Sequence, residues 1–473
     1  MALGKKLFEW KSNDMVLGMS TTREVGDGGF SPETDEINLI NTPGVMYSPA
    51  LPTDKSTNLV GDMAVSCENA TTLSGQDSIF LAIDDATKDG SYYYWNGSVL
   101  TLKRTDSTNN YAFGKNSIVS YKNGFYATSN EAIVYWTADD VTFNVSFKAF
   151  SDTSAPHPSL VFEDNIYFAD GDELIRQTSA GVAGTVILSL PTGTVITALG
   201  IDPGTGKMLI STTLGYNSSD TVPTVSKVSY YDGFSNKTNK SVIVDNTIQG
   251  FYSVGAVTYC SYGQNLGYWN GSGIQFLRNL SGILFQNEYL MYQGRFTNIG
   301  STLYVVEGSK ILAFGPITQG GSPVFYYAYK NRVNANIITH IKNLGQNILG
   351  IGFKDEKFYS WSTTSVASTN TQNFYSNNYT FDDEVWIRRV RVIYKNTVAD
   401  TVDPGSLFLT DASNTLISDK TYDLRNVSGA ASYIKDINNV DLRVKEVLFR
   451  LLLEGVNPGV KRVIFYGELA NLT

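Results

Sequence analysis

The sequence contains a repeated pattern with a period of 41 to 49 residues, and this repeat constrains the fold more than any other feature. Each copy is a short apolar run followed, after a turn, by a second apolar pair. Four copies, starting at residues 125, 166, 303 and 348, align without gaps, and looser ones start at 79, 208 and 257. A period of about 40 to 50 residues that holds two hairpins is typical of a propeller blade of four antiparallel strands. We therefore expect an all-β chain with a β-propeller of about seven four-stranded blades.

The composition favours strands over helices. Short runs rich in Tyr, Phe, Val, Ile and Thr are separated by pairs such as Asn123-Gly124 and Asp170-Gly171. These pairs supply the positive φ that tight hairpin turns require. Charged residues make up only 17% of the chain, which argues against long, charge-rich helices.

A propeller must also close its ring of blades. The extended stretch at 44–66 precedes the first copy of the repeat and could supply a strand to the last blade. Trp-Asn-Gly recurs at 95–97 and 269–271, and residues 230–233 (Tyr-Tyr-Asp-Gly) fill a similar position. We interpret these motifs as an aromatic residue followed by a turn within a blade.

The pattern changes near both ends of the chain. A connector rich in Ser, Thr and Asn at 364–378 is followed by longer strands expected at 385–394, 407–410, 447–453 and 460–466. The first forty residues contain no copy of the repeat and fit either an arm that reaches a neighbour or a frayed terminus. We therefore expect three parts, an extended N-terminal arm (1–42), the β-propeller (43–372) and a C-terminal β-sandwich (373–473).

The charge balance bears on partners and location. The net charge is −9, and residues 1–374 hold 24 basic and 32 acidic residues, so the protein repels nucleic acid and anionic lipid overall. No apolar run approaches the ~18 residues of a membrane span, and the first residues lack the apolar core of a signal peptide. We therefore expect no membrane insertion, synthesis in a reducing cytoplasm, and two buried free thiols at Cys67 and Cys260.

Two His and two Cys in the whole chain exclude a zinc ribbon, an iron–sulfur cluster and a multi-His metal centre. No cofactor, metal site or catalytic residue is expected. His157, between two prolines, and His340, in an apolar run, have no nucleophile or orienting carboxylate beside them by spacing. We expect His157 in a surface loop and His340 half-buried in a strand.

Other patterns that could carry chemistry are weak. Residues 137–143 resemble the Asp-box turn of sialidases, but the Gly is missing, and an ordinary blade turn is favoured. The propeller arginines are scattered (Arg104, Arg176, Arg278, Arg295 and Arg332), which disfavours an anion clamp. The acidic turns at 84–85, 170–172 and 382–384 match no Ca²⁺ loop and are interpreted as solvated turns. The aromatic run at 325–329 could stack on sugars, although packing between blades is favoured.

Arginines cluster in one expected strand of the C-terminal part. Partial alternation along 387–395 places Arg389 and Arg391 on one strand face and Arg388 on the other. A nucleic-acid or subunit contact is conceivable. Because acidic residues in the same part offset this charge, a solvated or interface strand face is favoured.

The whole pattern resembles the nozzle (tail tubular) proteins of tailed bacteriophages. The resemblance rests on the extended start that runs into Asn-Thr-Pro-Gly-Val at 41–45, the Trp-Asn-Gly blade markers, and two C-terminal segments, 388–392 (Arg-Arg-Val-Arg-Val) and 461–468 (Lys-Arg-Val-Ile-Phe-Tyr-Gly-Glu).

This resemblance implies a virion structural protein without enzymatic activity. Its subunits would form a ring, commonly six-fold, around the DNA exit channel of the tail and contact other tail proteins. Double-stranded DNA would pass through without sequence-specific binding, helped by an acidic wall. Two alternatives stay open: a propeller that binds carbohydrate or a host receptor, and a glycoside hydrolase, which would need two carboxylates at a fixed separation.

Overall fold

The computed structural model describes most of the chain after residue 48, and before it only the strand at 7–11. The described residues are 7–11, 49–56, 63–72, 75–83, 90–96, 99–106, 117–122, 124–129, 131–137, 142–214, 225–280, 295–316, 322–330, 333–353, 357–366, 371–376, 379–398, 404–410, 416–425, 432–454 and 459–469. They contain no α-helix, as expected, and hence no helix that could span a membrane. Contacts divide the chain into two compact units, one of 52–310 and 333–361, the other of 1–51, 311–332 and 362–473.

Six four-stranded antiparallel sheets each consist of four strands that are consecutive in the sequence. Their strands are β3 (Met63–Thr72), β4 (Gly75–Ile83), β5 (Gly90–Trp95), β6 (Leu100–Asp106); β7 (Ile118–Tyr121), β8 (Gly124–Thr128), β9 (Ala132–Thr137), β10 (Phe143–Ala149); β11 (Ser159–Phe162), β12 (Asn165–Asp170), β13 (Glu173–Gln177), β14 (Thr185–Ser189); β15 (Thr194–Asp202), β16 (Lys207–Leu214), β17 (Ser226–Tyr231), β18 (Asn239–Val244); β19 (Ile248–Val254), β20 (Val257–Tyr262), β21 (Asn265–Trp269), β22 (Ile274–Asn279); β23 (Phe296–Ile299), β24 (Thr302–Glu307), β25 (Lys310–Pro316) and β26 (Pro323–Lys330).

A further four-stranded sheet is composite. It joins β27 (Ile338–Asn343), β28 (Ile348–Phe353) and β29 (Phe358–Ser362) to β2 (Thr53–Asp54), which precedes all the other blades in the sequence. Six blades therefore consist of four consecutive strands, which is fewer than the expected number of about seven. The numbers differ because the last copy of the repeat, at residue 348, lies in the composite sheet. A closing strand from 44–66 was expected, and β2 confirms it.

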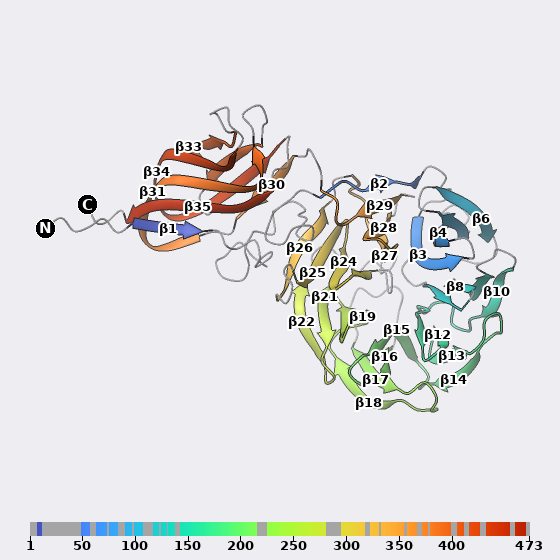
Figure 1. The fold of residues 1–473 in the computed structure, drawn as a ribbon. Coiled ribbons are helices and arrows are strands. Elements are labelled where there is room, and N and C mark those ends of the chain that lie inside the picture. Colours follow the sequence, from blue (N-terminus) through green and yellow to red (C-terminus); the bar gives the residue numbers. More distant parts are fainter. Residues whose placement is uncertain are drawn as a thin grey trace. The chain divides into compact units, whose positions relative to one another are not determined.

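The first strands of the sheets form a closed cycle of neighbours. In turn, β3 contacts β7, β7 contacts β11, β11 contacts β15, β15 contacts β19, β19 contacts β23, β23 contacts β27, and β27 contacts β3. Figure 1 shows the sheets from β7–β10 to β19–β22 fanning out around a common centre. This cyclic arrangement confirms a β-propeller, in which each sheet buries both faces against its neighbours.

Two backbone interactions beyond the ladder hold the closing strand. Thr53 and Asp54 lie opposite Ser360 and Tyr359 in antiparallel register. The N–H of Lys55 donates to the carbonyl of Phe358 at 2.8 Å, and the N–H of Phe358 donates to Ser56 Oγ at 2.9 Å. The composite sheet is thus tied to residues about 300 positions earlier in the chain.

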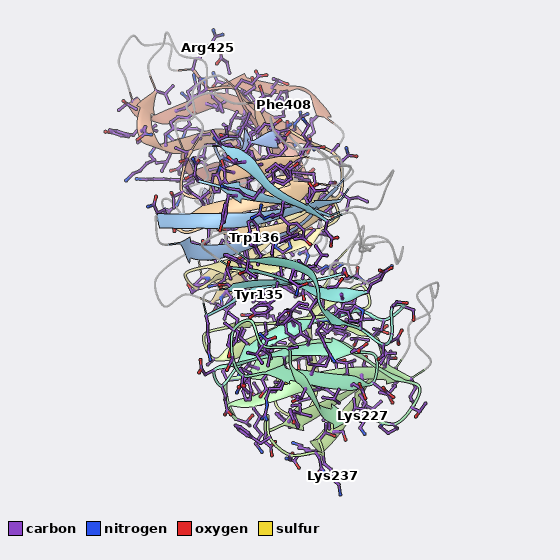
Figure 2. All side chains as sticks on the ribbon, turned by 90° about the vertical axis from the view of Figure 1, so that its right-hand side faces the viewer. Tyr135, Trp136, Lys227, Lys237, Phe408 and Arg425 are labelled. Carbon is purple, nitrogen blue, oxygen red and sulfur yellow. The ribbon has the colours of Figure 1, made fainter. Side chains whose placement is uncertain are left out.

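Aromatic side chains near the ends of the third strands pack between successive sheets. Tyr135 and Trp136, labelled in Figure 2, are consecutive in β9 and therefore point to opposite faces of their sheet. Trp136 contacts Tyr92 and Tyr94 of the preceding sheet at ring separations of 6.2 and 5.0 Å. Tyr135 belongs to a buried cluster with Phe168 of the following sheet.

The aromatic-plus-turn motifs mark the hairpin between the third and fourth strands. Trp269 ends β21, and the side chain of Asn270 accepts N–H bonds from Ser272 and Gly273 at 3.0 and 2.9 Å. Asn96 likewise accepts the N–H of Val99, at 2.9 Å. The interpretation of these motifs is therefore confirmed.

The C-terminal residues and the first described strand form one seven-stranded sheet. Its strands are β1 (Leu7–Lys11), β30 (Gln372–Tyr375), β31 (Tyr379–Val398), β32 (Ser406–Thr410), β33 (Leu416–Asp423), β34 (Ser432–Leu453) and β35 (Val460–Leu469). The order is β1-β35-β31-β34-β32-β33, and β30 also pairs with β34. The strands expected at 385–394, 407–410, 447–453 and 460–466 lie within β31, β32, β34 and β35. Of the expected N-terminal arm (1–42), only β1 lies within the described residues.

Candidate interaction surface

Both histidines are buried. The His157 ring is fully buried and stacks on Phe150 at 3.8 Å, with Nδ1 3.0 Å from the carbonyl oxygen of Ala169. The expectation of a surface loop was wrong, because the flanking prolines hold an extended segment packed inside the propeller. His340 is also buried, in β27. Of the expected thiols, Cys260 is free and buried, and burial raises its pKa; the Cys67 side chain lies outside the described residues.

The propeller arginines hold neighbouring sheets together. Arg176 donates to the carbonyl of Gly233 at 3.1 Å, in the turn of the next sheet. Arg295 donates to the carboxamide oxygen of Gln249 at 2.8 Å, and both side chains are buried. Arg332 lies outside the described residues. These side chains act in separate places, as their scattered positions predicted.

Asp170 is not a solvated turn residue. It is buried, and its carboxylate accepts hydrogen bonds from the backbone N–H groups of Ser151 and Asp152 and from the Ser151 hydroxyl, at 2.8–3.0 Å. The expectation was wrong here because the carboxylate ties the end of β12 to the connector between β10 and β11. Residues 84–85 and 138–141 lie outside the described part, and 382–384 lie in β31. No group of three or more His, Cys, Asp or Glu side chains that could hold a metal was found among the described residues.

The aromatic run at 325–329 lies in β26, and its tyrosines are buried. Tyr326, Tyr327 and Tyr329 are at most 4% exposed. Phe325 stacks on Phe314 of β25 at 4.3 Å. This agrees with packing rather than with a platform for sugars.

A cavity that the sequence did not reveal lies beside β16, β17 and β18. Its volume is about 460 Å³, and its lining is mostly aliphatic and hydroxyl-bearing, with Lys227, labelled in Figure 2, as the charged member. The lining residues are Leu190, Pro191, Thr194, Ile210, Thr212, Thr213, Leu214, Val225, Lys227, Ser229, Thr238 and Ile243. This lining suits an apolar group.

Charged and aromatic side chains gather on one face of the C-terminal sheet. We call it the arginine–aromatic face and define it by Trp386, Arg388, Arg389 and Arg391 of β31, Asp436, Asp441 and Arg443 of β34, and Tyr466 and Glu468 of β35. All nine side chains are partly or fully exposed.

A bulge in β31 brings all three of its arginines to this face. Ile387 pairs with Leu442 and Gly467, but the next paired residue is Arg389, so Arg388 is an extra residue in the strand. Ile387 and Val390 are buried, while Arg388, Arg389 and Arg391 are not. The expected placement of Arg388 on the opposite face was wrong, because strict alternation does not hold across a bulge.

The guanidinium groups lie over aromatic rings. Arg388 and Arg443 both contact Trp386, with guanidinium carbons 2.9 and 4.3 Å from the ring centroid. Arg389 lies 4.1 Å from the Tyr466 centroid. Such contacts stabilise by about 0.5–1 kcal/mol each at exposed sites, and they fix the plane of the guanidinium.

Carboxylates neutralise two of the four arginines. Arg391 donates two hydrogen bonds to Asp436, at 2.7 and 2.8 Å, and these hold the pKa of Asp436 below its usual value. Arg388 lies 3.3 Å from carboxylate oxygens of both Asp441 and Glu468. The indole N–H of Trp386 also donates to Asp441, at 2.5 Å.

The other two arginines of the face, Arg389 and Arg443, make no ion pair within 4.0 Å in the part of the chain that the structure describes. Their stacked guanidinium groups retain donors for a further acceptor. On this face, carboxylates of the same sheet therefore neutralise Arg388 and Arg391. Arg389 and Arg443 can bind carboxylate or phosphate oxygens.

No family model and no curated protein matches the sequence. Among the solved structures, a chain of the crystal structure of the mitotic checkpoint complex is similar, with a TM-score of 0.46 and 8% identity, over 67% of this chain and 92% of that one.

Proposed function

We propose that the protein is a virion structural protein of a phage tail, a ring-forming nozzle or tail-tube subunit around the DNA exit channel. The arginine–aromatic face is the observation that carries this proposal. Trp, Tyr and Arg are enriched in protein–protein interfaces and dominate their binding energy. A partly exposed sheet face that gathers six such residues suits a subunit that functions by assembly.

The overall charge supports passage of DNA rather than binding to it. Residues 1–374 carry a net charge of −8 from 24 basic and 32 acidic residues. An acidic channel wall would repel phosphates and let double-stranded DNA slide without sequence-specific contacts. In this proposal the ring is six-fold and contacts other tail proteins. The protein, made in the host cytoplasm, resides in the virion tail and has no cofactor and no enzymatic activity.

The finer fold assignments belong to the same proposal. The composite sheet is the seventh blade, because β27 completes the cycle of first strands. The C-terminal sheet folds over as a two-layer sandwich along β34, which pairs with β31 over its first part and with β30 and β32 over its second. The ring contact of 5.8 Å between Phe449 and Phe465 supports two facing layers. The boundaries 1–42, 43–372 and 373–473 stay predictions.

Electron microscopy of the purified protein, with mass determination by light scattering, tests the proposal. We expect closed rings of several copies and no hydrolysis of glycosides. A protein that stays monomeric over a wide concentration range would overturn it. A monomer or trimer that binds defined glycans would instead support the alternative, a carbohydrate- or receptor-binding propeller.

A further inference from the structure

We infer that Arg389 and Arg443 form a docking site for carboxylates of a second copy of this chain. The inference rests on the proposed function and names the contact through which copies of the protein would associate. It starts from a difference between the partners of the four arginines on the arginine–aromatic face. Arg388 and Arg391 are held by carboxylates of their own sheet, whereas Arg389 and Arg443 are held by aromatic rings.

Stacking prepares these two guanidinium groups for binding. Arg389 rests on Tyr466 and Arg443 on Trp386, so both planes are fixed before a partner arrives. A guanidinium that is already oriented loses less conformational entropy when it forms two parallel hydrogen bonds to a carboxylate. This preorganisation is what an interface requires of side chains that bind in a defined geometry.

The two positions are separated along the sheet. Arg443 lies directly opposite Trp386 in the ladder, and Arg389 follows three residues later in β31, next to Tyr466 of β35. Because Arg388 is an extra residue, this step matches two residues of β35, from Glu468 to Tyr466, or about 7 Å along the strand. This spacing suits carboxylates on two different residues of a folded partner better than one small anion.

The neighbouring charges favour protein carboxylates over nucleic acid. Asp436, Asp441 and Glu468 lie among the arginines and would repel a continuous row of phosphates. The rings of Trp386 and Tyr466 are already covered by guanidinium groups and do not offer free faces for bases to stack on. Two separate carboxylates would need only the remaining donors of Arg389 and Arg443, although Arg389 already lies within electrostatic reach of Asp436.

A second copy of the chain supplies the required acidic surface. The chain has 45 acidic and 36 basic residues, and most of the excess lies in residues 1–374. Two copies therefore repel each other on average, and a local basic patch that faces acidic groups would offset this repulsion. The arginine–aromatic face meets this requirement.

Charge reversal of the two arginines tests this site. The full-length double variant R389E/R443E is compared with wild type by sedimentation velocity over a range of protein and salt concentrations. The control K227E/K237E reverses two exposed lysines of the propeller (Figure 2), and both variants change the net charge from −9 to −13. Circular dichroism and thermal melting establish whether each variant is folded. If R389E/R443E is not folded, R389Q/R443Q replaces it.

We expect R389E/R443E to associate at least tenfold more weakly than wild type, and K227E/K237E to stay within about twofold. R389K/R443K, which keeps the charge but loses the planar fork, should fall between them. Association of R389E/R443E at wild-type strength would overturn the docking site and leave the ring proposal standing. A wild-type protein that never associates would overturn both. Loss of binding to a duplex DNA probe, with assembly unchanged, would identify the face as a nucleic-acid surface instead.

Discussion

The indole N–H of Trp269 donates a hydrogen bond to the hydroxyl oxygen of Tyr230 at 2.9 Å, and so joins the third strands of two successive propeller sheets. The Tyr230 hydroxyl in turn donates at 2.9 Å to Asp202, the last residue of β15. All three side chains are buried. One hydroxyl group thus satisfies a donor in one sheet and an acceptor in another.

Tyr230→Phe should destabilise the propeller by about 1–3 kcal/mol, because it leaves the buried Trp269 N–H without its acceptor and removes one of the three hydrogen bonds to the Asp202 carboxylate. Chemical denaturation followed by fluorescence measures this loss. Tyr433→Phe is the matched control, because Tyr433 is 56% exposed and its variant should unfold like wild type. Equal stability of both variants would show that the hydrogen-bonded chain contributes nothing.

Gly200→Ala should also destabilise the propeller, by about 1–3 kcal/mol, through overpacking. A Cβ atom at Gly200 in β15 would lie 2.4 Å from Cβ of Phe251 in β19, so the first strands of two adjacent sheets would have to move apart. Gly273→Ala, with no atom within 4 Å of the added Cβ, should change stability by less than about 0.5 kcal/mol. Thermal unfolding of the two variants, measured side by side, compares their losses of stability.

Lys55→Pro should weaken ring closure, because it removes the N–H that donates to the Phe358 carbonyl. We expect a loss of about 1–3 kcal/mol and faster cleavage near residue 55 in limited proteolysis. Lys55→Ala retains the N–H and should behave like wild type. If the two variants are equally resistant to protease, β2 does not hold the ring closed.

Stability should fall at alkaline pH because of two buried tyrosines. Burial raises the pKa values of Tyr126 and Tyr231 from 10.0 to about 12 in the folded protein. Well below pH 10 both hydroxyls are protonated in the folded and in the unfolded state, so their titration does not make the free energy of unfolding depend on pH there. Between pH 10 and 12 the unfolded chain loses these protons and the folded protein keeps them, which lowers stability. Denaturation series across this range should show a smaller decline for Tyr126→Phe than for wild type.

The repeat was predictable from the sequence because the second strands of four of the sheets are buried on both faces. Residues 125, 166, 303 and 348, which mark four copies of the repeat, lie in β8, β12, β24 and β28. Almost all residues of these strands are buried. Such strands appear as continuous apolar runs. The outermost strands β10, β14 and β18 are mostly exposed and leave no comparable signal.

The site was less predictable, for two physical reasons. The arginines of β31 were recognised, but the bulge that turns Arg388 to the same side depends on how β34 and β35 pair with the strand. Trp386, Arg443 and Tyr466 come from three strands, and only the tertiary register brings them together. The pairing of β1 with β35 was not foreseen, because a five-residue strand carries too little pattern to indicate so distant a partner.

The position of β2 imposes an order on biosynthesis. Its residues leave the ribosome about 300 residues before Phe358, the residue to which they bind. At typical translation rates of 5–20 residues per second, this edge waits about 15–60 s for its partner. During that interval the earlier blades form in a propeller that is not yet closed, so the nascent chain exposes strand edges that the closed propeller covers. Crowded or chaperone-poor conditions would therefore reduce the yield of folded protein before any subunit assembles.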